Sequence, residues 1–352
     1  MKAFNVDGHI EQRYKIIRQI GSGAYGIVWC ALDRQTRRPV ALKKVFGAFE
    51  NQPDAQRTYR EVMLLGALHH GSIVRLTNVI RSVNDNDLYL TFELAETDLS
   101  TILLHNILLP VHQQYLAYQV VKIVAYLHSH GVLHRDLKPA NIFVNSDCGI
   151  KLGDFGLARC AQAQGEDVFR DLTYYVATRW YRAPEVLAKS TNYTTAMDIW
   201  AVGCIIYELL TASTLFQGHS TPHQLSLILS ALGEPTAADL DSLESSEAWP
   251  LMDSSTSIES HPLRESLRGH DPDAVDLICK LVVFNPKKRL TAREALRHPY
   301  FAPFFTHKDI EELDKAEVIS LPLPDDKNFP VADYKEALYE VISLRFRQHV
   351  PL

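Results

Sequence analysis

Residues 134–141 read HRDLKPAN, and residues 154–156 read DFG. The two stretches place two aspartates, a lysine and an asparagine within a short span of the chain. One interpretation is that these are four unrelated polar residues. Their order and spacing argue against it, so the rest of the sequence has to show what they form.

The composition is that of a globular protein. The chain has 352 residues, of which 46% are hydrophobic and 22% charged, enough for one large core or two ordinary ones. No apolar run with a cleavage site begins the chain, and the longest apolar stretch is interrupted by Glu208. The five cysteines form no CxxC pair, which favours free thiols in a reducing compartment. We expect a soluble cytoplasmic protein without a membrane partner, and leave the nucleus open as a second location.

The charge is uneven along the chain. Residues 1–95 carry 13 basic and 9 acidic side chains, and the remainder carries 23 and 33, for a net charge of −6. A general nucleic-acid binder has dominant, clustered basic residues. We therefore expect no nucleic-acid partner.

Hydrophobic periodicity divides the chain into a sheet part and a helical part. Residues 13–95 read as strands interrupted by one helical segment at 54–68. Residues 110–131 form an amphipathic helical pattern that ends at Gly131, and residues 195–210 are apolar almost all round, as in a buried helix. A small sheet domain thus precedes a large helical one, in which residues 233–268 have the composition of an insertion.

Three glycines, Gly21, Gly23 and Gly26, lie between the first two predicted strands. A glycine loop can close over phosphates because glycine lets the backbone approach them closely, although a plain hairpin turn explains the same residues. Lys43, in the third predicted strand, needs an anionic partner in a partly apolar site, and Glu61 in the following helix can supply it.

With HRDLKPAN and DFG, together with APE at 183–185, residues 12–303 resemble a eukaryotic protein kinase. The resemblance implies an α+β, bilobal fold with a small antiparallel sheet lobe that holds one helix, and a larger, mainly helical lobe. It divides the chain into an N-terminal extension (1–11), an N-lobe (12–95), a C-lobe (96–303, with the insert at 233–268) and a C-terminal extension (304–352) that packs back towards the N-lobe.

Catalytic roles follow from this resemblance. Asp136 would accept the proton of the substrate hydroxyl, and Lys138 would neutralise charge on the transferred phosphoryl group. Asp154 and Asn141 would hold Mg²⁺, while Lys43 and Glu61 form the ion pair that serves ATP. Phosphoryl transfer needs positioning and charge neutralisation more than covalent help, so these groups suffice. Glu185 would pair with Arg289 as a structural bridge.

The resemblance also implies an ATP site in the first part of the chain. Phe92 would close the rear of the adenine pocket, and Glu93 and Ala95 would offer backbone hydrogen bonds to the base. The expected nucleotide-binding residues are Ile20, Gly21, Ser22, Gly23, Ala24, Tyr25, Gly26, Val28, Ala41, Lys43, Phe92, Glu93, Leu94 and Ala95.

The stretch TYYVATRWYRAPE, residues 173–185, resembles the activation segment of mitogen-activated protein kinases, which carry Thr-x-Tyr before VATRWYRAPE. Thr173 and Tyr175 are the implied phosphorylation sites, and Tyr174 takes the middle place. A constitutively ordered loop with incidental hydroxyl groups is the alternative. Arginines are the expected readers of the phosphates: Arg57, Arg60, Arg135 and Arg159 for Thr173, and Arg179 and Arg182 for Tyr175. On their own, Arg57 and Arg60 also fit an ordinary charged helix face.

The same segment implies Ser/Thr-Pro protein substrates, because proline has no N–H to donate and Arg182 would draw the carbonyl of Ala177 away from the peptide. Acidic residues Asp309, Glu311, Glu312 and Asp314 lie where this family docks basic peptides, although a solvated charge run fits equally well.

Two other functions stay open. A cyclin-dependent kinase would lack Thr-x-Tyr and would usually end soon after its last helix. A pseudokinase scaffold would bind partners without chemistry, and the intact Lys43, Asp136 and Asp154 argue against it. The sequence most resembles the atypical extracellular-signal-regulated kinase branch, and activation by self-phosphorylation or by an upstream kinase is left undecided.

Overall fold

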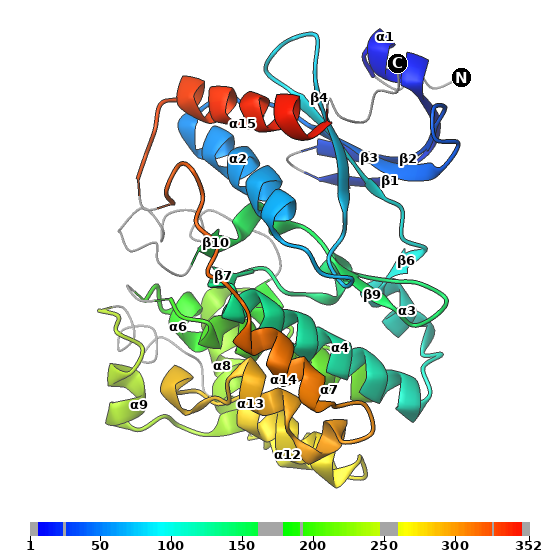
Figure 1. Cartoon of the computed structure of the whole chain (residues 1–352). Helices are drawn as coiled ribbons and strands as arrows, with labels where there is room; N and C mark the ends of the chain where they lie inside the picture. The colour runs from blue at the N-terminus through cyan, green and yellow to red at the C-terminus, as the bar shows by residue number, and fades with distance from the viewer. Residues whose placement is uncertain are drawn as a thin grey trace. The chain divides into compact units, whose positions relative to one another are not determined.

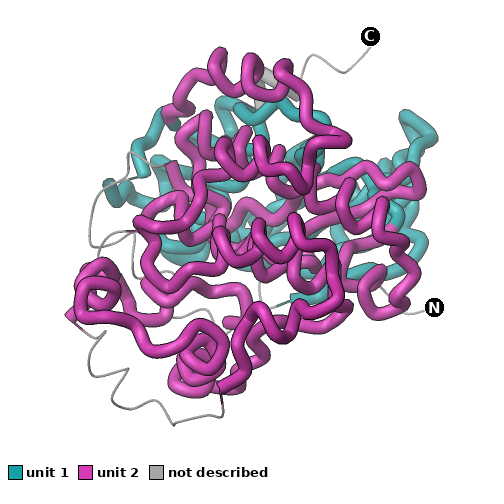
Figure 2. Tube along the Cα trace, turned by 90° about the horizontal axis from the view of Figure 1, so that it is seen from below, with its two compact units in different colours: residues 1–96, 321–352 teal, residues 97–320 magenta. Residues whose placement is uncertain are grey.

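The computed structural model describes residues 6–23, 26–160, 179–190, 193–246, 260–325 and 327–346, with only the backbone for 342–346. The chain divides into two compact units (Figure 2). Unit 1 comprises residues 1–96 and 321–352, and unit 2 comprises residues 97–320. The last part of the chain therefore belongs to the same unit as the first.

Unit 1 is built on one antiparallel sheet of five strands in the order β1-β2-β3-β5-β4. The strands are β1 (Tyr14–Gly23), β2 (Gly26–Asp33), β3 (Pro39–Val45), β4 (Leu76–Arg81) and β5 (Leu88–Glu93). A Cβ on Gly26 would lie 2.0 Å from the main-chain oxygen of Lys44 in β3. The pairing of β2 with β3 thus itself requires this glycine of the predicted phosphate loop.

The two faces of this sheet differ, because successive residues of a strand point to opposite sides. One face carries Trp29, Leu42 and Tyr89 and packs against α1 (Gly8–Arg13) through Ile10, in a fully buried core. The other face carries Lys43. A short helix ahead of β1 was not predicted, and it explains why the strands have two buried faces instead of simple apolar-polar alternation.

Helix α2 (Gln52–Ala67) completes the small unit. It begins at an Asn51 cap, whose side chain accepts a hydrogen bond from Asp54 N, and Pro53 lies in its first turn, where a missing N–H costs nothing. The last helix, α15 (Val331–Phe346), lies beside α2 (Figure 1).

Unit 2 is mainly helical, around α4 (Pro110–Ser129) and the almost entirely buried α7 (Ala196–Thr211). A Cβ on Gly203 of α7 would lie 2.6 Å from a methyl carbon of Val282, so glycine permits the close approach of the chain that follows α12 (Pro272–Leu281). The other helices are α3 (Leu99–His105), α6 (Pro184–Leu187), α8 (Thr221–Leu232), α9 (Ala237–Asp241), α11 (Leu263–Ser266), α13 (Ala292–Leu296) and α14 (His307–Asp314).

Short strands in unit 2 frame the loops that carry HRDLKPAN and DFG. They are β6 (Thr97–Asp98), β7 (Val132–Leu133), β8 (Ile142–Val144), β9 (Ile150–Leu152) and β10 (Arg159–Cys160). They form a β6-β8-β9 sheet and a β10-β7 pair. Single turns of 3₁₀ helix cover Pro139–Asn141, Phe155–Leu157, Arg179–Tyr181, Pro286–Lys288 and Pro299–Phe301.

The predicted fold class is confirmed: a five-stranded antiparallel sheet with a helix precedes a larger helical region. Within the described ranges, no helix has the length and apolar character that a membrane span requires.

Candidate active site

In unit 1 the structure brings Lys43 and Glu61 together. The Lys43 ammonium donates to a Glu61 carboxylate oxygen at 2.7 Å, and their side chains are 22% and 8% exposed. Lys43 lies in the middle of β3, opposite Val28 of β2 and Leu90 of β5. Glu61 comes from the third turn of α2. The pair is thus fixed by a sheet at one end and by a helix at the other.

Other predicted nucleotide-binding residues share the Lys43 face of the sheet. Gly21 is opposite Val28, and Ala41, two residues before Lys43, is opposite Phe92. Because a strand repeats every two residues, these side chains and Lys43 line the same face. Ala24 and Tyr25 lie outside the described residues. Ile20, Ser22, Gly23 and Gly26 belong to the β1–β2 strands, and Leu94 and Ala95 follow β5 as partly exposed residues.

In unit 2 the HRDLKPAN loop gathers Asp136, Lys138 and Asn141 around one carboxylate. Oδ2 of Asp136 accepts hydrogen bonds from the Lys138 ammonium at 2.6 Å and from the Asn141 amide at 3.1 Å. The same Asn141 amide donates to the main-chain oxygen of Asp136 at 2.9 Å. Among the described residues, Oδ1 of Asp136 accepts no hydrogen bond. The loop therefore presents one oxygen of the carboxylate to a further proton donor.

The Asp198 carboxylate, on α7, holds the main chain of this loop in place. It accepts the main-chain N–H groups of His134 at 2.9 Å and Arg135 at 2.8 Å, and Nε2 of His128 lies at 3.0 Å. Burial alone would raise the pKa of Asp198, but the His128 and Arg135 hydrogen bonds outweigh it and hold that pKa below its usual value. The residue stays charged and keeps the loop in place, with Arg135 in a left-handed conformation at φ 68°.

The DFG stretch is tied to the same loop. Gly153 N donates to the main-chain oxygen of Asn141 at 2.9 Å, and the ring of His134 meets that of Phe155 edge-on at 5.0 Å. These contacts hold Asn141 and Asp154 in neighbouring segments. Asp154 itself has φ 59°, a left-handed conformation that non-glycine residues adopt only when the surroundings impose it.

Asn141 and Asp154 have the donor set that Mg²⁺ requires. Both offer hard oxygen ligands, and Mg²⁺ needs only one or two protein carboxylates when substrate phosphates and waters complete its octahedron. Because the amide nitrogen of Asn141 is used by Asp136, its carbonyl oxygen is left as the ligand atom. Elsewhere in the described ranges, no group of three or more His, Cys, Asp or Glu could hold a metal ion.

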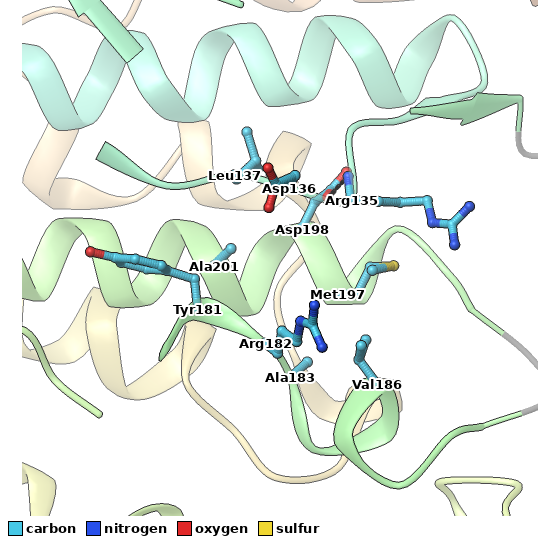
Figure 3. A pocket seen from close by; sticks show the side chains of 10 residues that line it. All are labelled: Arg135, Asp136, Leu137, Tyr181, Arg182, Ala183, Val186, Met197, Asp198 and Ala201. Atoms are coloured by element: carbon cyan, nitrogen blue, oxygen red, sulfur yellow. Dashed lines mark hydrogen bonds between the residues drawn. The ribbon is translucent and has the colours of Figure 1, made fainter. Parts of the chain in front are cut away.

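The structure places the predicted phosphate-reading arginines in different surroundings. Arg135 and Arg182 line one small cavity beside Asp136 (Figure 3). Arg159 donates to its own neighbour, Ala158 O, at 2.9 Å, and Arg179 donates to His219 O at 3.1 Å. Thr173 and Tyr175 lie outside the described residues, so their contact with these arginines stays a prediction.

On α2, Arg60 is almost completely buried and Arg57 partly so. Nε of Arg60 donates to Asp325 at 2.6 Å, so this arginine, predicted to read a phosphate on Thr173, already pairs with a carboxylate and has only its Nη atoms left for that role. Asp325 belongs to the C-terminal extension and was missed by the sequence reasoning. No local signal in LPLPDD identifies it, since its partner is 265 positions away.

The predicted bridge between Glu185 and Arg289 is confirmed. The two oxygens of Glu185 accept Nη1 and Nη2 of Arg289 at 2.6 and 2.7 Å, and both side chains are buried. This bridge fixes the APE segment to the chain after α12.

The acidic cluster at 309–314 is only partly available to a partner. Asp309 is 4% exposed and accepts the Lys122 ammonium at 2.6 Å and the Tyr118 hydroxyl at 2.8 Å. Burial would raise its pKa, but the Lys122 and Thr306 bonds hold that pKa below its usual value. Asp314 pairs with Arg293. Glu311, Glu312 and Asp314 are exposed, but Asp314 is engaged by Arg293 and Glu312 lies 4.0 Å from the Lys122 ammonium.

Comparisons with known proteins agree with this geometry. Residues 14–301 match the family model described as "Protein kinase domain". Over 348 residues the chain is 45% identical to "Extracellular signal-regulated kinase 2" of Dictyostelium discoideum, which covers 97% of this chain and 93% of that protein.

Two further relatives carry mitogen-activated names. The chain is 46% identical over 346 residues to "Mitogen-activated protein kinase 15" of Xenopus laevis, with 97% of this chain and 59% of the relative covered. It is 46% identical over 301 residues to "Mitogen-activated protein kinase 4a" of Physcomitrium patens, with 84% and 79% covered. The chain thus spans most of the slime-mould protein but 59% of the frog protein.

Proposed function

Because the chain belongs to the protein kinase family, as a serine/threonine kinase of the mitogen-activated type in its atypical extracellular-signal-regulated branch, we propose that Asp136 is its catalytic base. The observation that carries the proposal is that only one oxygen of the Asp136 carboxylate accepts hydrogen bonds from the described residues. Lys138 and Asn141 bind Oδ2, which leaves Oδ1 to accept the proton of a serine or threonine hydroxyl.

Lys138 then has two tasks. Its ammonium orients Asp136 at 2.6 Å, and it can neutralise negative charge on the transferred phosphoryl group without leaving the loop. Lys43, held by Glu61, binds the phosphates of ATP, the phosphoryl donor of this family. When bound, Mg²⁺ supplies charge neutralisation at the phosphates, and Asn141 and Asp154 are the residues that would hold it.

Substrate choice is proposed to require proline after the acceptor. The test compares two matched peptides, Ser-Pro and Ser-Ala, as substrates of the active enzyme, with an Asp136→Asn variant as the control for contaminating kinases. The Ser-Pro peptide is expected to react faster, and only with the unaltered enzyme. Equal rates for the two peptides would refute proline direction, and activity of the variant equal to that of the unaltered enzyme would refute the role of Asp136.

Activation is proposed to proceed by phosphorylation of Thr173 and Tyr175. The predicted arginine contacts support this, since a charge-assisted hydrogen bond contributes about 1.5–3 kcal/mol. Two such bonds near the upper end of that range, or three near its middle, reach the roughly 5.5 kcal/mol that shifts a loop from 1:99 to 99:1. Mass mapping of phosphatase-treated protein after incubation with Mg-ATP tests it, with Asp154→Asn as the control. Phosphate on both residues in the unaltered protein alone indicates self-phosphorylation. Phosphate in neither points to an upstream kinase, and sites elsewhere would refute the assignment.

The proposed partners follow from the same assignment: protein substrates with Ser/Thr-Pro sites, an upstream kinase and basic docking peptides in the cytoplasm or nucleus. Because Asp309 is buried against Lys122 and Tyr118, and Asp314 is paired with Arg293, docking would depend on Glu311 and Glu312. Glutamine at both positions is expected to weaken binding of a basic peptide, measured by fluorescence anisotropy. Unchanged affinity would remove the docking idea.

A further inference from the structure

The C-terminal extension places an extended segment along α2. We call residues 321–330 the C-terminal strap. Its polar contacts to α2 lie in the first nine of the sixteen residues of the helix: Gln52 Nε2 to Phe329 O at 3.1 Å, Gln56 Nε2 to Lys327 O at 3.3 Å, Leu323 N to Tyr59 Oη at 3.0 Å and Arg60 Nε to Asp325 Oδ1 at 2.6 Å. The four helix residues are spaced as one face of a helix. The strap therefore holds that face along the N-terminal half of α2.

One of these contacts is an ion pair that is almost fully buried. The side chains of Arg60 and Asp325 are 1% and 4% exposed. In the described part of the chain, the buried Nη1 and Nη2 atoms of Arg60 have no hydrogen-bond partner. Leaving buried donors unpaired costs free energy. An ion pair that makes one bond and leaves two buried N–H groups unpaired adds little to the free energy of unfolding, so stability alone does not explain it.

Apolar contacts already attach the extension to α2. Tyr59 is buried and its ring lies 5.5 Å from that of Tyr334, at the start of α15. Tyr334 in turn binds the strap, accepting from Phe329 N at 3.2 Å and donating to Lys327 O at 3.3 Å. Specifying one arrangement of the segments around it is an attested role of a buried ion pair.

The arrangement that matters is the position of the next residue. Glu61 follows Arg60, and the 100° step of a helix directs the two side chains to different sides. Arg60 is bound to Asp325, and Glu61 is bound to Lys43 at 2.7 Å. A rotation of α2 that withdraws Arg60 from Asp325 also displaces Glu61 from Lys43.

We propose that Asp325 is a positioning residue for phosphoryl transfer: through Arg60 it fixes the rotation of α2, and so keeps Glu61 on Lys43. The proposal rests on the proposed role of Lys43 and Glu61 in binding ATP. Asp325 touches no substrate in this scheme, and its effect passes through the helix. The C-terminal strap thereby becomes part of the catalytic apparatus of unit 1.

The test compares Asp325→Asn with Lys335→Gln. Asn keeps the size of Asp325 and removes its charge. Lys335 lies in the same C-terminal extension, where its ammonium pairs with Asp85 at 2.6 Å, so its variant loosens the extension away from Arg60. We expect Asp325→Asn to lower kcat about tenfold, equivalent to about 1.4 kcal/mol, with little change in the KM for the peptide. Lys335→Gln should leave kcat unchanged.

Two further readouts separate positioning from loss of folded protein. Amide hydrogen exchange in apo Asp325→Asn should rise in α2 but not in α4 or α7. The loss of kcat should persist well below the unfolding temperature, and Asp325→Glu should restore part of it. Equal losses of kcat in Asp325→Asn and Lys335→Gln would overturn the proposal. Amide exchange that rises throughout the chain in Asp325→Asn would overturn it as well.

A Glu61→Gln variant distinguishes failure of this inference from failure of the proposed function. If Glu61→Gln lowers kcat and Asp325→Asn does not, Asp325 has no positioning role, while the ion pair of Lys43 keeps its own. If Glu61→Gln leaves kcat unchanged, the proposed role of the Lys43–Glu61 pair is refuted, and the proposed role of Asp325 is refuted with it.

Discussion

Two buried arginine–carboxylate pairs, one in each unit, differ in how completely the arginine is hydrogen-bonded. Arg289 uses both Nη atoms on Glu185, and its N–H groups also donate to main-chain oxygens. Those acceptors are Val283 at 2.8 Å, Ala196 at 2.8 Å and Phe284 at 3.0 Å. Arg60 makes a single bond to Asp325, and its Nη atoms are buried without partners among the described residues.

The difference shows that a buried ion pair can have either of two roles: it can hold a structural scaffold together, or it can set the position of a functional helix. A fully bonded guanidinium has no better arrangement available, so it fixes the segments around it as a scaffold. A guanidinium with two unpaired Nη groups is held by its one remaining bond, so its position depends on that single carboxylate. The pair in unit 2 ties the APE segment to the chain after α12, and the pair in unit 1 lies on a helix whose rotation decides the Lys43–Glu61 contact.

The largest effect is expected from Arg289→Met. The change leaves the Glu185 carboxylate buried and unpaired, and removes the donors of three main-chain oxygens. Removing one partner of a buried pair costs about 3–5 kcal/mol of unfolding free energy. Urea denaturation measures it, with unaltered protein as the reference. A loss below about 1 kcal/mol would mean that the full bonding of Arg289 contributes little.

Replacing both members of a pair should separate the two sites. We expect Arg60→Met with Asp325→Leu to change the unfolding free energy by about 1 kcal/mol or less, because apolar residues of similar volume replace an incompletely bonded pair. Arg289→Met with Glu185→Leu should cost more, since main-chain oxygens lose their donors. Thermal unfolding of both double variants is the measurement. Equal losses would erase the distinction drawn between the pairs.

Glu208 is a partly buried carboxylate that forms no ion pair in the described part of the chain, and it extends the comparison. Glu208 accepts the hydroxyls of Tyr181 at 2.6 Å and Thr214 at 3.4 Å. Burial raises its pKa above the usual value near 4.5 more than these bonds lower it. A raised pKa of an acid in the folded state means that this group favours folding at acidic pH and opposes it as pH rises through that pKa.

Glu208→Gln should therefore flatten the pH dependence of stability above about pH 4.5, where an ordinary glutamate loses its proton. Relative to the unaltered protein, the variant should gain stability between acidic and neutral pH. Denaturant midpoints measured across that range give the result. Parallel pH profiles for the two proteins would show that burial of Glu208 has no energetic consequence.

The smallest effect is expected at the surface. Arg268 and Glu265 lie 3.5 Å apart with side chains 82% and 66% exposed. Exposed pairs contribute about 0–1 kcal/mol, so Glu265→Gln should change the unfolding free energy by less than about 0.5 kcal/mol. The same urea titration measures it, and a loss comparable to that of Arg289→Met would show that bonding and burial do not rank these pairs.

Local sequence patterns predicted the fold and much of the site geometry. Periodicity located α2, α4 and α7, and the resemblance to protein kinases anticipated the Lys43–Glu61 and Glu185–Arg289 contacts. These contacts join residues that belong to recognisable motifs. These contacts were predictable because the residues that form them could be recognised by their motifs, without knowledge of the distances between them.

The missed features depend on contacts between segments far apart in the chain. Lys44 is as basic as its neighbour Lys43, yet it lies buried near Asp7 and Asp87 on the opposite face of the sheet. His128 has no motif of its own, and only the fold brings it to Asp198. Asp325 is one of two consecutive aspartates, and only the path of the C-terminal strap selects it for Arg60.

The most direct test of this account measures stability and turnover together in Glu185→Gln and Asp325→Asn, using urea denaturation and kcat per folded molecule on a Ser-Pro peptide. The account predicts that Glu185→Gln loses the larger share of unfolding free energy and retains most of its turnover, while Asp325→Asn loses about tenfold in kcat with the smaller loss of stability. Losses of stability and turnover in the same proportion in both variants would contradict it.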